Sequence, residues 1–452
     1  MNVTTMVMKL YKSAIMMPIF GWMIIGLLQN CQHLSFCLIT HHRLGWAATK
    51  CSFSTTSPTG SSHDATWLAE NPFIRVILPI GLSATNEPLF YNIMAISSHQ
   101  LYMLKDKRFE RDIWMYRAKA LRGFQHEIAR FRDDDQSSKG WEQVIATLIM
   151  LTFFDISQDA SPAWLIHQRC ARNIQALLPI TNNLSMTQLD LFRFFRYHFA
   201  QHEAFARTAY DILDPHAAYV CWFPHGLEAD MTIIDALLGC SPELISLILE
   251  ISNLAAQRLS VASTTKGNFE SNSRRDEGQA ICAWRNNIER RLYFLEQVLP
   301  CSPSLSIGCN QDGQGAIEEL GYIAETRRLS ALLYMYSRLD HIPPGFAPID
   351  KLTTQILALM PKISLRSHAL LWPLFVVGTM GIGVVNPESG DAQRIFVLER
   401  LVSLQQTRQL KNVRRAREIV EFVWKMRDLQ GPEYMGGWYD IGRVGSYGVS
   451  LC

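Results

Sequence analysis

The sequence feature that most constrains the fold is the spacing of apolar residues. From about Trp67 to Asp428 they recur every three to four positions, and the strict alternation of a half-buried strand is nearly absent. Between residues 241 and 262 they surround nearly the whole expected helix, as in helices buried inside large assemblies. No repeat of fixed period appears, which argues against a regular solenoid. The sequence therefore predicts an all-α domain over residues 67–430, a large irregular multi-helix bundle of about a dozen helices.

Capping sequences mark several expected helix starts. A serine or asparagine before proline places a side-chain acceptor at the N-cap and a residue without an N–H at the first helical position. A serine followed three residues later by glutamine forms a capping box. These signals occur at Ser161-Pro162, Ser241-Pro242, Asn386-Pro387 and Ser185 with Gln188.

Two stretches interrupt the helical pattern. Residues 263–279 contain almost nothing apolar, which predicts a mobile, solvated loop. Residues 431–452 hold six glycines, which favours an irregular, solvated tail.

The N-terminal segment, residues 1–66, has no clear helical period. Its apolar run at residues 14–28 follows Lys9 and Lys12, an order typical of a signal peptide or membrane anchor. The run is shorter than the ~17–25 residues of a spanning helix and contains Pro18. Two interpretations stay open: a genuine membrane-directed segment, or sequence that does not belong to the folded protein, such as a faulty gene model.

Charge and cysteine usage narrow the function. The formal net charge is only +2, and the sequence has no strongly basic stretch that could contact the phosphates of a nucleic acid. The ten cysteines include no CxxC pair of the kind that structural zinc sites use. We therefore expect reduced, buried cysteines and no bound metal or other cofactor.

A glycine pattern, Gly378-x-x-Gly381-x-Gly383, follows an apolar run and imitates a dinucleotide-binding turn. That fold needs a strand before the glycines, yet Pro373 lies inside the supposed strand, and Asn386 occupies the third glycine position. The pattern instead favours close helix packing through small residues.

Asn310 to Gly321 imitates a calcium-binding EF-hand loop. The loop would need an acidic first residue and a bidentate glutamate at its twelfth position, where this sequence has Asn310 and Gly321. We interpret the segment as a polar cap before the next helix.

Three further clusters of polar residues can be interpreted either as functional sites or as ordinary packing or surface residues. His198, His202 and Glu203 share one helix face, but the HExxH pattern and a third ligand are missing, so packing residues are expected. Asp133 to Asp135 lacks the spaced third carboxylate of a magnesium-binding motif, so a solvated loop is expected. Lys411 to Arg417 is the densest basic cluster, expected as a solvated face, with a nuclear import signal as the alternative. No catalytic, cofactor-binding, metal-binding or DNA-binding residue is predicted.

From Trp67 onward the chain resembles the fungal-specific transcription factor domain, the regulatory region that follows the zinc cluster in fungal regulators. The order and spacing of individually unspecific apolar segments carry this resemblance to about Asp428. They are Asn71-Pro72-Phe73, Leu78-Pro79, NIMAISSHQL, YRAKAL, VIATLIMLTFFDIS, PAWLIHQRCARNIQALL, HALLWPLFVVGTMG, ERLVSL and NVRRAREIVEFVW.

The resemblance implies an all-α domain that regulates transcription of RNA polymerase II genes in the nucleus, often in response to a metabolite, without catalytic residues. Family members usually carry six clustered cysteines and a basic linker near the N-terminus. Cys31, Cys37 and Cys51 do not form that pattern, so the zinc cluster is absent here. Specific DNA binding by this chain alone is therefore not expected.

The expected partners are proteins of the transcription machinery or a DNA-binding homologue, with a small-molecule effector and a homodimer as further options. Two alternatives remain. One is an all-α enzyme of the terpene-synthase kind, which needs magnesium and a second acidic motif. The other is a membrane-tethered helical scaffold, which requires residues 14–28 to be a genuine anchor.

Overall fold

The structure is a computed structural model. It describes residues 72–83, 87–103, 106–133, 140–158, 163–177, 184–209, 222–223, 231–264, 271–300, 311–365, 367–383, 390–408, 411–430 and 449–451. This part of the chain contains thirteen α-helices and short 3₁₀ and π turns, and its only β-type pairing consists of two isolated bridges. The all-α fold of about a dozen helices is confirmed.

The chain divides into two compact units. The first comprises Met1–Met150, Asn183–Phe192 and Cys309–Gly313, and the second comprises Leu151–Asn182, Arg193–Gly308 and Gln314–Cys452. Three helices pass from one unit to the other: α7 (Trp141–Gln158), α9 (Met186–Ala209) and α12 (Gln311–Leu339), whose residues up to Gly313 belong to the first unit.

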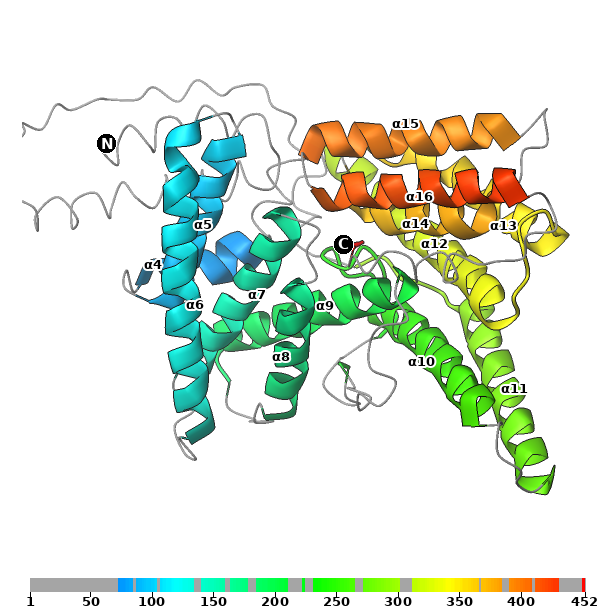
Figure 1. Cartoon of the computed structure of the whole chain (residues 1–452), viewed down its shortest axis with the longest axis horizontal. Coiled ribbons are helices and arrows are strands. Elements are labelled where there is room, and N and C mark those ends of the chain that lie inside the picture. Colours follow the sequence, from blue (N-terminus) through cyan, green and yellow to red (C-terminus); the bar gives the residue numbers. More distant parts are fainter. Residues whose placement is uncertain are drawn as a thin grey trace, which may run out of the picture. The chain divides into compact units, whose positions relative to one another are not determined.

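In the first unit, α5 (Pro88–Met103) and α6 (Glu110–Asp133) lie side by side (Figure 1). Gly123 allows this approach, because a Cβ there would lie 2.7 Å from a ring carbon of Pro88. Before them comes the short α4 (Leu78–Ser83), which packs against α5. The sequence makes α5 apolar on most of its surface, and it forms the centre of this unit.

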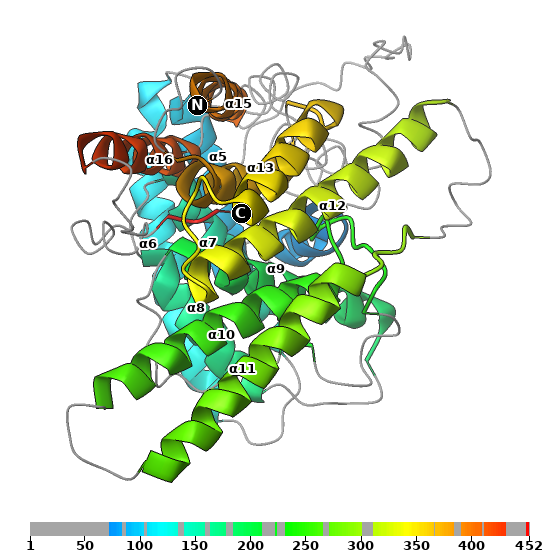
Figure 2. The same ribbon diagram turned by 90° about the vertical axis from the view of Figure 1, so that its right-hand side faces the viewer.

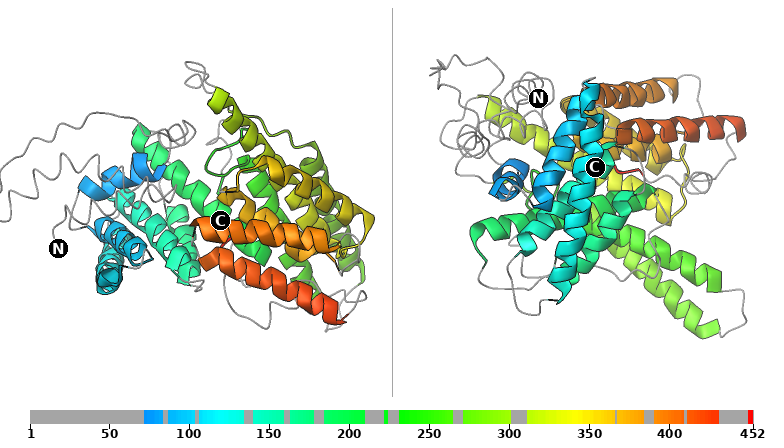
Figure 3. Two further views of the ribbon diagram at one scale, coloured as in Figure 1. Left: turned by 90° about the horizontal axis from the view of Figure 1, so that it is seen from above. Right: turned by 60° about the vertical axis from the view of Figure 1, so that its left-hand side comes forward.

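The second unit holds most of α12 and the whole of the remaining helices. They are α8 (Ala163–Leu177), α10 (Pro242–Thr264), α11 (Ser271–Phe294), α12 (Gln311–Leu339), α13 (Ala347–Leu359), α14 (Leu371–Val376), α15 (Gly390–Arg408) and α16 (Lys411–Gln430). Figure 2 shows α10 and α11 as an antiparallel pair, and Figure 3 shows α15 beside α16. The core of the unit includes the fully buried helix α14, where every side chain from Leu371 to Val376 is buried.

Two of the expected caps are confirmed by hydrogen bonds. The Ser185 N–H donates to Gln188 Oε1 at 2.9 Å, and the Gln188 N–H donates to Ser185 Oγ at 3.3 Å, which completes a capping box. At the start of α10, the Leu244 N–H donates to Ser241 Oγ at 3.4 Å. The starts expected at Ser161-Pro162 and Asn386-Pro387 lie outside the described residues.

Helix α11 begins at Ser271, so the loop expected over residues 263–279 is helical in its second part, and α10 already extends to Thr264. The segment contains almost nothing apolar, but charged and long polar residues propagate a helix well. The polar composition of the segment therefore did not indicate a loop over its whole length.

The end of the chain also differs from the solvated tail expected over residues 431–452. Val449, Ser450 and Leu451 are buried, and Asn412 Nδ2 at the start of α16 donates to the Ser450 carbonyl at 3.0 Å. The glycine content of the tail does not predict that Val449 and Leu451 are buried. Burial of these two apolar side chains stabilises the end of the chain against the helices.

Candidate functional site

One glutamate in the core of the second unit has a nearly saturated set of donors. Glu203 lies in α9, and only 3% of its side chain is exposed. Its Oε1 accepts from Arg172 at 2.5 Å and pairs with Arg207 at 2.8 Å. Its Oε2 accepts from Arg172 Nε and Trp222 Nε1, both at 2.9 Å, with Gln168 Nε2 at 3.4 Å. We call these five residues the Glu203 cluster.

The electrostatics of the Glu203 cluster favour a permanently ionised carboxylate. Burial alone raises the pKa of Glu203, but the hydrogen bond from Arg172 and the charges of Arg207 and Arg172 outweigh it, so the pKa lies below its usual value. Burial, reinforced by the neighbouring Arg172, lowers the pKa of Arg207. A carboxylate surrounded in this way holds α8, α9 and the segment at Trp222 together and has little capacity left for a ligand.

The sequence indicated only part of this cluster. Glu203 was a candidate because it stands beside His202, whereas Arg172 and Trp222 lie 31 and 19 residues away from it in the chain. Neither spacing corresponds to a motif. Only the packing of α8 against α9 brings these side chains together.

The two histidines of the same helix are buried and lie close together. Their ring centroids are 4.1 Å apart, and His202 Nδ1 lies 2.7 Å from the His198 carbonyl, to which it can donate. Trp164 contacts His202 edge-on with ring centroids 6.4 Å apart. The expected packing role is in line with these contacts. In the part of the chain that the structure describes, no group of three or more metal-ligating side chains is placed to hold a metal ion.

Burial sets the protonation of both rings. It lowers the pKa of His202 to about 4, partly offset by the hydrogen bond to the His198 carbonyl, and it lowers the pKa of His198 well below its usual range, with His202 adding to the effect. Both rings are therefore neutral in the native state at neutral pH.

We expect the free energy of unfolding to fall as the pH is lowered from about 6.5 to about 4. In this window the unfolded chain protonates His202 but the native chain does not, which costs on the order of 3 kcal/mol. Urea unfolding at a series of pH values measures the effect. His202→Gln should make this part of the profile shallower, with the contribution of His198 remaining, whereas the exposed His126→Gln should leave it unchanged. Equal slopes in His202→Gln and the unaltered chain would contradict the assignment.

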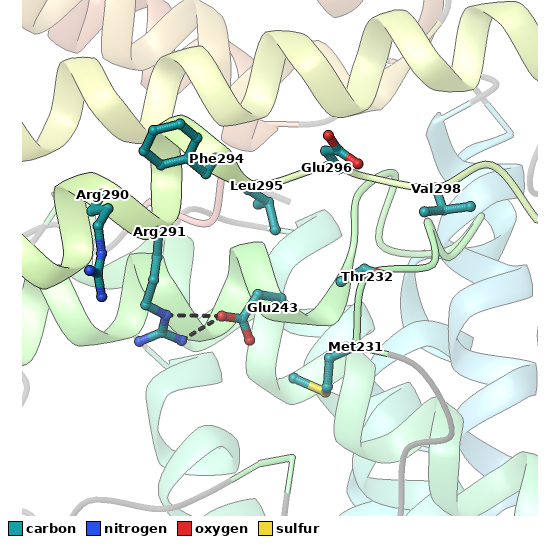
Figure 4. A pocket seen from close by; sticks show the side chains of 9 residues that line it. All are labelled: Met231, Thr232, Glu243, Arg290, Arg291, Phe294, Leu295, Glu296 and Val298. Carbon is teal, nitrogen blue, oxygen red and sulfur yellow. Dashed lines mark hydrogen bonds and ion pairs between the residues drawn. The ribbon is translucent and has the colours of Figure 1, made fainter.

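An open pocket of about 500 Å³ lies where α11 ends and the chain continues to Val298 (Figure 4). Figure 4 shows Phe294 on one side, Arg290 and Arg291 together, and Met231 near the opposite end. The pocket is lined by Met231, Thr232, Glu243, Arg290, Arg291, Phe294, Leu295, Glu296 and Val298. It therefore combines an apolar wall with charged groups.

Hydrogen bonds fix the geometry of this pocket. Arg291 Nε and Nη2 donate to Glu243 Oε1 at 3.1 and 2.5 Å, and Arg291 Nη1 donates to Glu250 at 2.9 Å. The Val298 N–H donates to the Thr232 carbonyl at 3.0 Å, and the Ile234 N–H donates to the Val298 carbonyl at 2.8 Å. These bonds hold the segment after α11 against residues 232–234.

The basic cluster is located on α16, one helical turn before two glutamates. Arg414 and Arg415 pair with Glu418 at 3.5 and 3.3 Å, and Arg417 pairs with Glu421 at 3.4 Å. These are partly exposed helix pairs, which contribute little to stability and offset part of the local positive charge. The solvated face expected for this cluster fits the geometry.

The glycine pattern forms a helix–helix contact. Gly378 and Gly381 lie in a π turn after α14, where a Cβ would come within 2.7 Å of Val420 and 2.5 Å of Thr353. Trp424 Nε1 donates to the Gly378 carbonyl at 2.7 Å. The close packing that the sequence predicts is confirmed, and the segment before the glycines is a helix where a dinucleotide turn needs a strand.

The EF-hand lookalike is helical, because α12 begins at Gln311 and runs through Gly321. The expectation of a polar cap there is wrong for the same reason: nearly the whole segment lies inside the helix. Its Gln and Glu residues support a helix despite the three glycines. Asp133 is the last residue of α6, and the two aspartates after it lie outside the described residues.

Three cysteines fall in the described residues, all of them free. Cys240 is buried, and burial raises the pKa of its thiol to about 12, so it stays protonated. Cys170 is partly buried and Cys282 is exposed, which contradicts the burial expected for cysteines in this chain. Cys282 lies on the outer face of α11, which the polar composition of that helix explains.

None of the helices in the described residues combines the length and apolar character that crossing a membrane requires. The apolar run at residues 14–28 lies outside the described residues.

Comparison with known proteins identifies the family. No curated protein and no solved structure matches the chain significantly. The sequence profile of the fungal specific transcription factor domain matches residues 49–452. The match begins inside the N-terminal segment 1–66 and continues through all thirteen α-helices of the described residues. The chain therefore belongs to the fungal specific transcription factor domain family.

Proposed function

We propose that this chain regulates RNA polymerase II transcription in the nucleus through protein partners or a small effector, and not by reading DNA itself. The supporting observation is the pairing of the basic residues on α16: Arg414 and Arg415 share Glu418, and Arg417 pairs with Glu421. Sequence-specific binding needs side chains that reach base edges and cations that contact phosphates. Paired arginines on one helix face provide neither.

The two alternative functions receive less support. A terpene-synthase-like enzyme needs carboxylates that hold magnesium, and Glu203, the most enclosed carboxylate described above, is occupied by arginines. A membrane-tethered scaffold depends on residues 14–28, and no observation in the described residues favours it.

We expect the purified chain to retain no defined DNA motif from a pool of random duplexes at about 150 mM salt. Fluorescence anisotropy followed by sequencing of the retained duplexes measures this. The variant Glu418→Gln with Glu421→Gln removes the partners of the arginines, so it should bind duplexes more tightly at low salt, without sequence preference. Enrichment of one motif by the unaltered chain would contradict the proposal.

A further inference from the structure

An exposed apolar knob lies beside the pocket at the end of α11. Phe294 is 79% exposed, the largest exposure among the exposed large apolar residues of the described chain. Its neighbours Val298 and Leu299 are also exposed, as is Ile233, which pairs with Val298 through a backbone bridge. Phe294 and Val298 line the same pocket, and exposed apolar side chains gathered around a pocket are typical of a contact site.

The pocket does not enclose a small ligand. Small-molecule sites usually bury most of the surface of their ligand, roughly 70–90%. Here the most prominent apolar wall, Phe294, faces solvent, and Glu296 and Val298 are exposed as well. An open pocket with a protruding aromatic side chain suits a second protein surface.

Charges of opposite sign border the apolar patch. Arg290 lies one turn before Phe294 on α11, and Glu296 follows two residues after Phe294. Both side chains are exposed, and neither has an ion-pair partner within the described residues. The neighbouring Arg291 differs, because it is held between Glu243 and Glu250.

The surface is therefore self-complementary. It carries a knob, Phe294, next to an apolar pocket wall formed by Met231, Leu295 and Val298, with a cation on one side of the knob and an anion on the other. A two-fold axis makes residue i of one copy meet residue j of the second, and residue j meet residue i. In a two-fold pair of copies, the cation of each copy can meet the anion of the other, and the Phe294 side chain of each copy can meet the apolar pocket wall of the other.

We propose that the chain forms a two-fold homodimer in which Phe294 of each copy inserts into the pocket of the other, and Arg290 of each copy pairs with Glu296 of the other. The interface covers a small patch, so we expect a dissociation constant on the order of 10 µM. The inference goes beyond the proposed function and does not depend on it, because dimerisation is measured without DNA.

Sedimentation velocity of the full chain from about 1 to 200 µM tests the dimer, with a monomer–dimer equilibrium as the expected result. Phe294→Asp should weaken dimerisation by about 30-fold or more, as loss of a central aromatic anchor does. The matched control is Phe346→Asp, at a phenylalanine that is 55% exposed elsewhere in the same unit, and it should leave the equilibrium unchanged. A chain that stays monomeric, or a dimer insensitive to Phe294→Asp, would overturn the proposal.

Charge reversal provides the sharper test. Arg290→Glu alone and Glu296→Arg alone should each weaken dimerisation by about tenfold, since each places like charges opposite each other. The double variant restores opposite charges across the two-fold axis and should recover dimerisation to within about threefold. Circular dichroism checks that each variant keeps its helices. If the double variant dimerises as weakly as the single variants, the pairing of Arg290 with Glu296 is wrong and the proposed interface is contradicted.

Discussion

Replacement of Glu203 by alanine is expected to lower the free energy of unfolding by about 3–5 kcal/mol. The substitution leaves Arg172 and Arg207 buried side by side without a counter-charge, and it removes the acceptor for Trp222 Nε1. A buried charge without its partner is among the costliest defects a core can carry. Urea unfolding at pH 7 measures the loss.

The matched control is Glu421→Ala, which breaks an exposed ion pair with Arg417 on α16. Exposed pairs of this kind contribute about 0.2–1 kcal/mol, so the control should change stability little. Glu203→Gln separates charge from hydrogen bonding, because it keeps one acceptor oxygen but no negative charge. A loss for Glu203→Ala no larger than that for Glu421→Ala would show that the cluster does not stabilise the core as described.

Replacement of Trp372 by alanine is expected to cost about 3–5 kcal/mol. Trp372 in α14 is completely buried and stacks on Phe205, with ring centroids 4.6 Å apart and planes inclined by 7°. Its Nε1 donates to Thr208 Oγ1 at 3.0 Å, so truncation both opens a cavity and removes a buried hydrogen bond.

Trp372→Phe preserves an aromatic ring and should cost roughly half as much, since the cavity is smaller. The control is Trp284→Ala, at a tryptophan of α11 that is 36% exposed, where a smaller loss is expected. Thermal and urea unfolding of the three variants rank these effects. Equal losses at Trp372 and Trp284 would contradict the central position of α14 in the core.

Features encoded by residues close together in the chain could be predicted from the sequence. The capping box of Ser185 and Gln188 needs two residues three positions apart, and both hydrogen bonds form. The glycines at 378 and 381 indicated close helix packing, although their contacts with Val420 and Thr353 could not be named. The apolar period likewise predicted the all-α class, because one face of each helix must leave water.

Helix boundaries were predicted less well where a polar composition suggests a loop but the backbone propensity of the same residues favours a helix. The segment at 263–279 is polar, yet α11 begins at Ser271, because helix formation requires suitable backbone propensity and does not require burial of every turn. Asn310 to Gly321 resembles a loop by its polar residues and glycines, yet most of it belongs to α12, a helix of 29 residues.

The sequence by itself determined the helical class, several helix starts and the family of this protein, since each depends on local spacing or on the order of segments. Only the tertiary structure decided which side chains meet. Arg172 reaches Glu203 across 31 residues of chain, and Phe294, Arg290 and Glu296 line one pocket with Met231, which lies far earlier in the sequence. Such contacts arise when apolar faces pack and carry polar side chains with them, and no local pattern encodes the partner that each side chain will find.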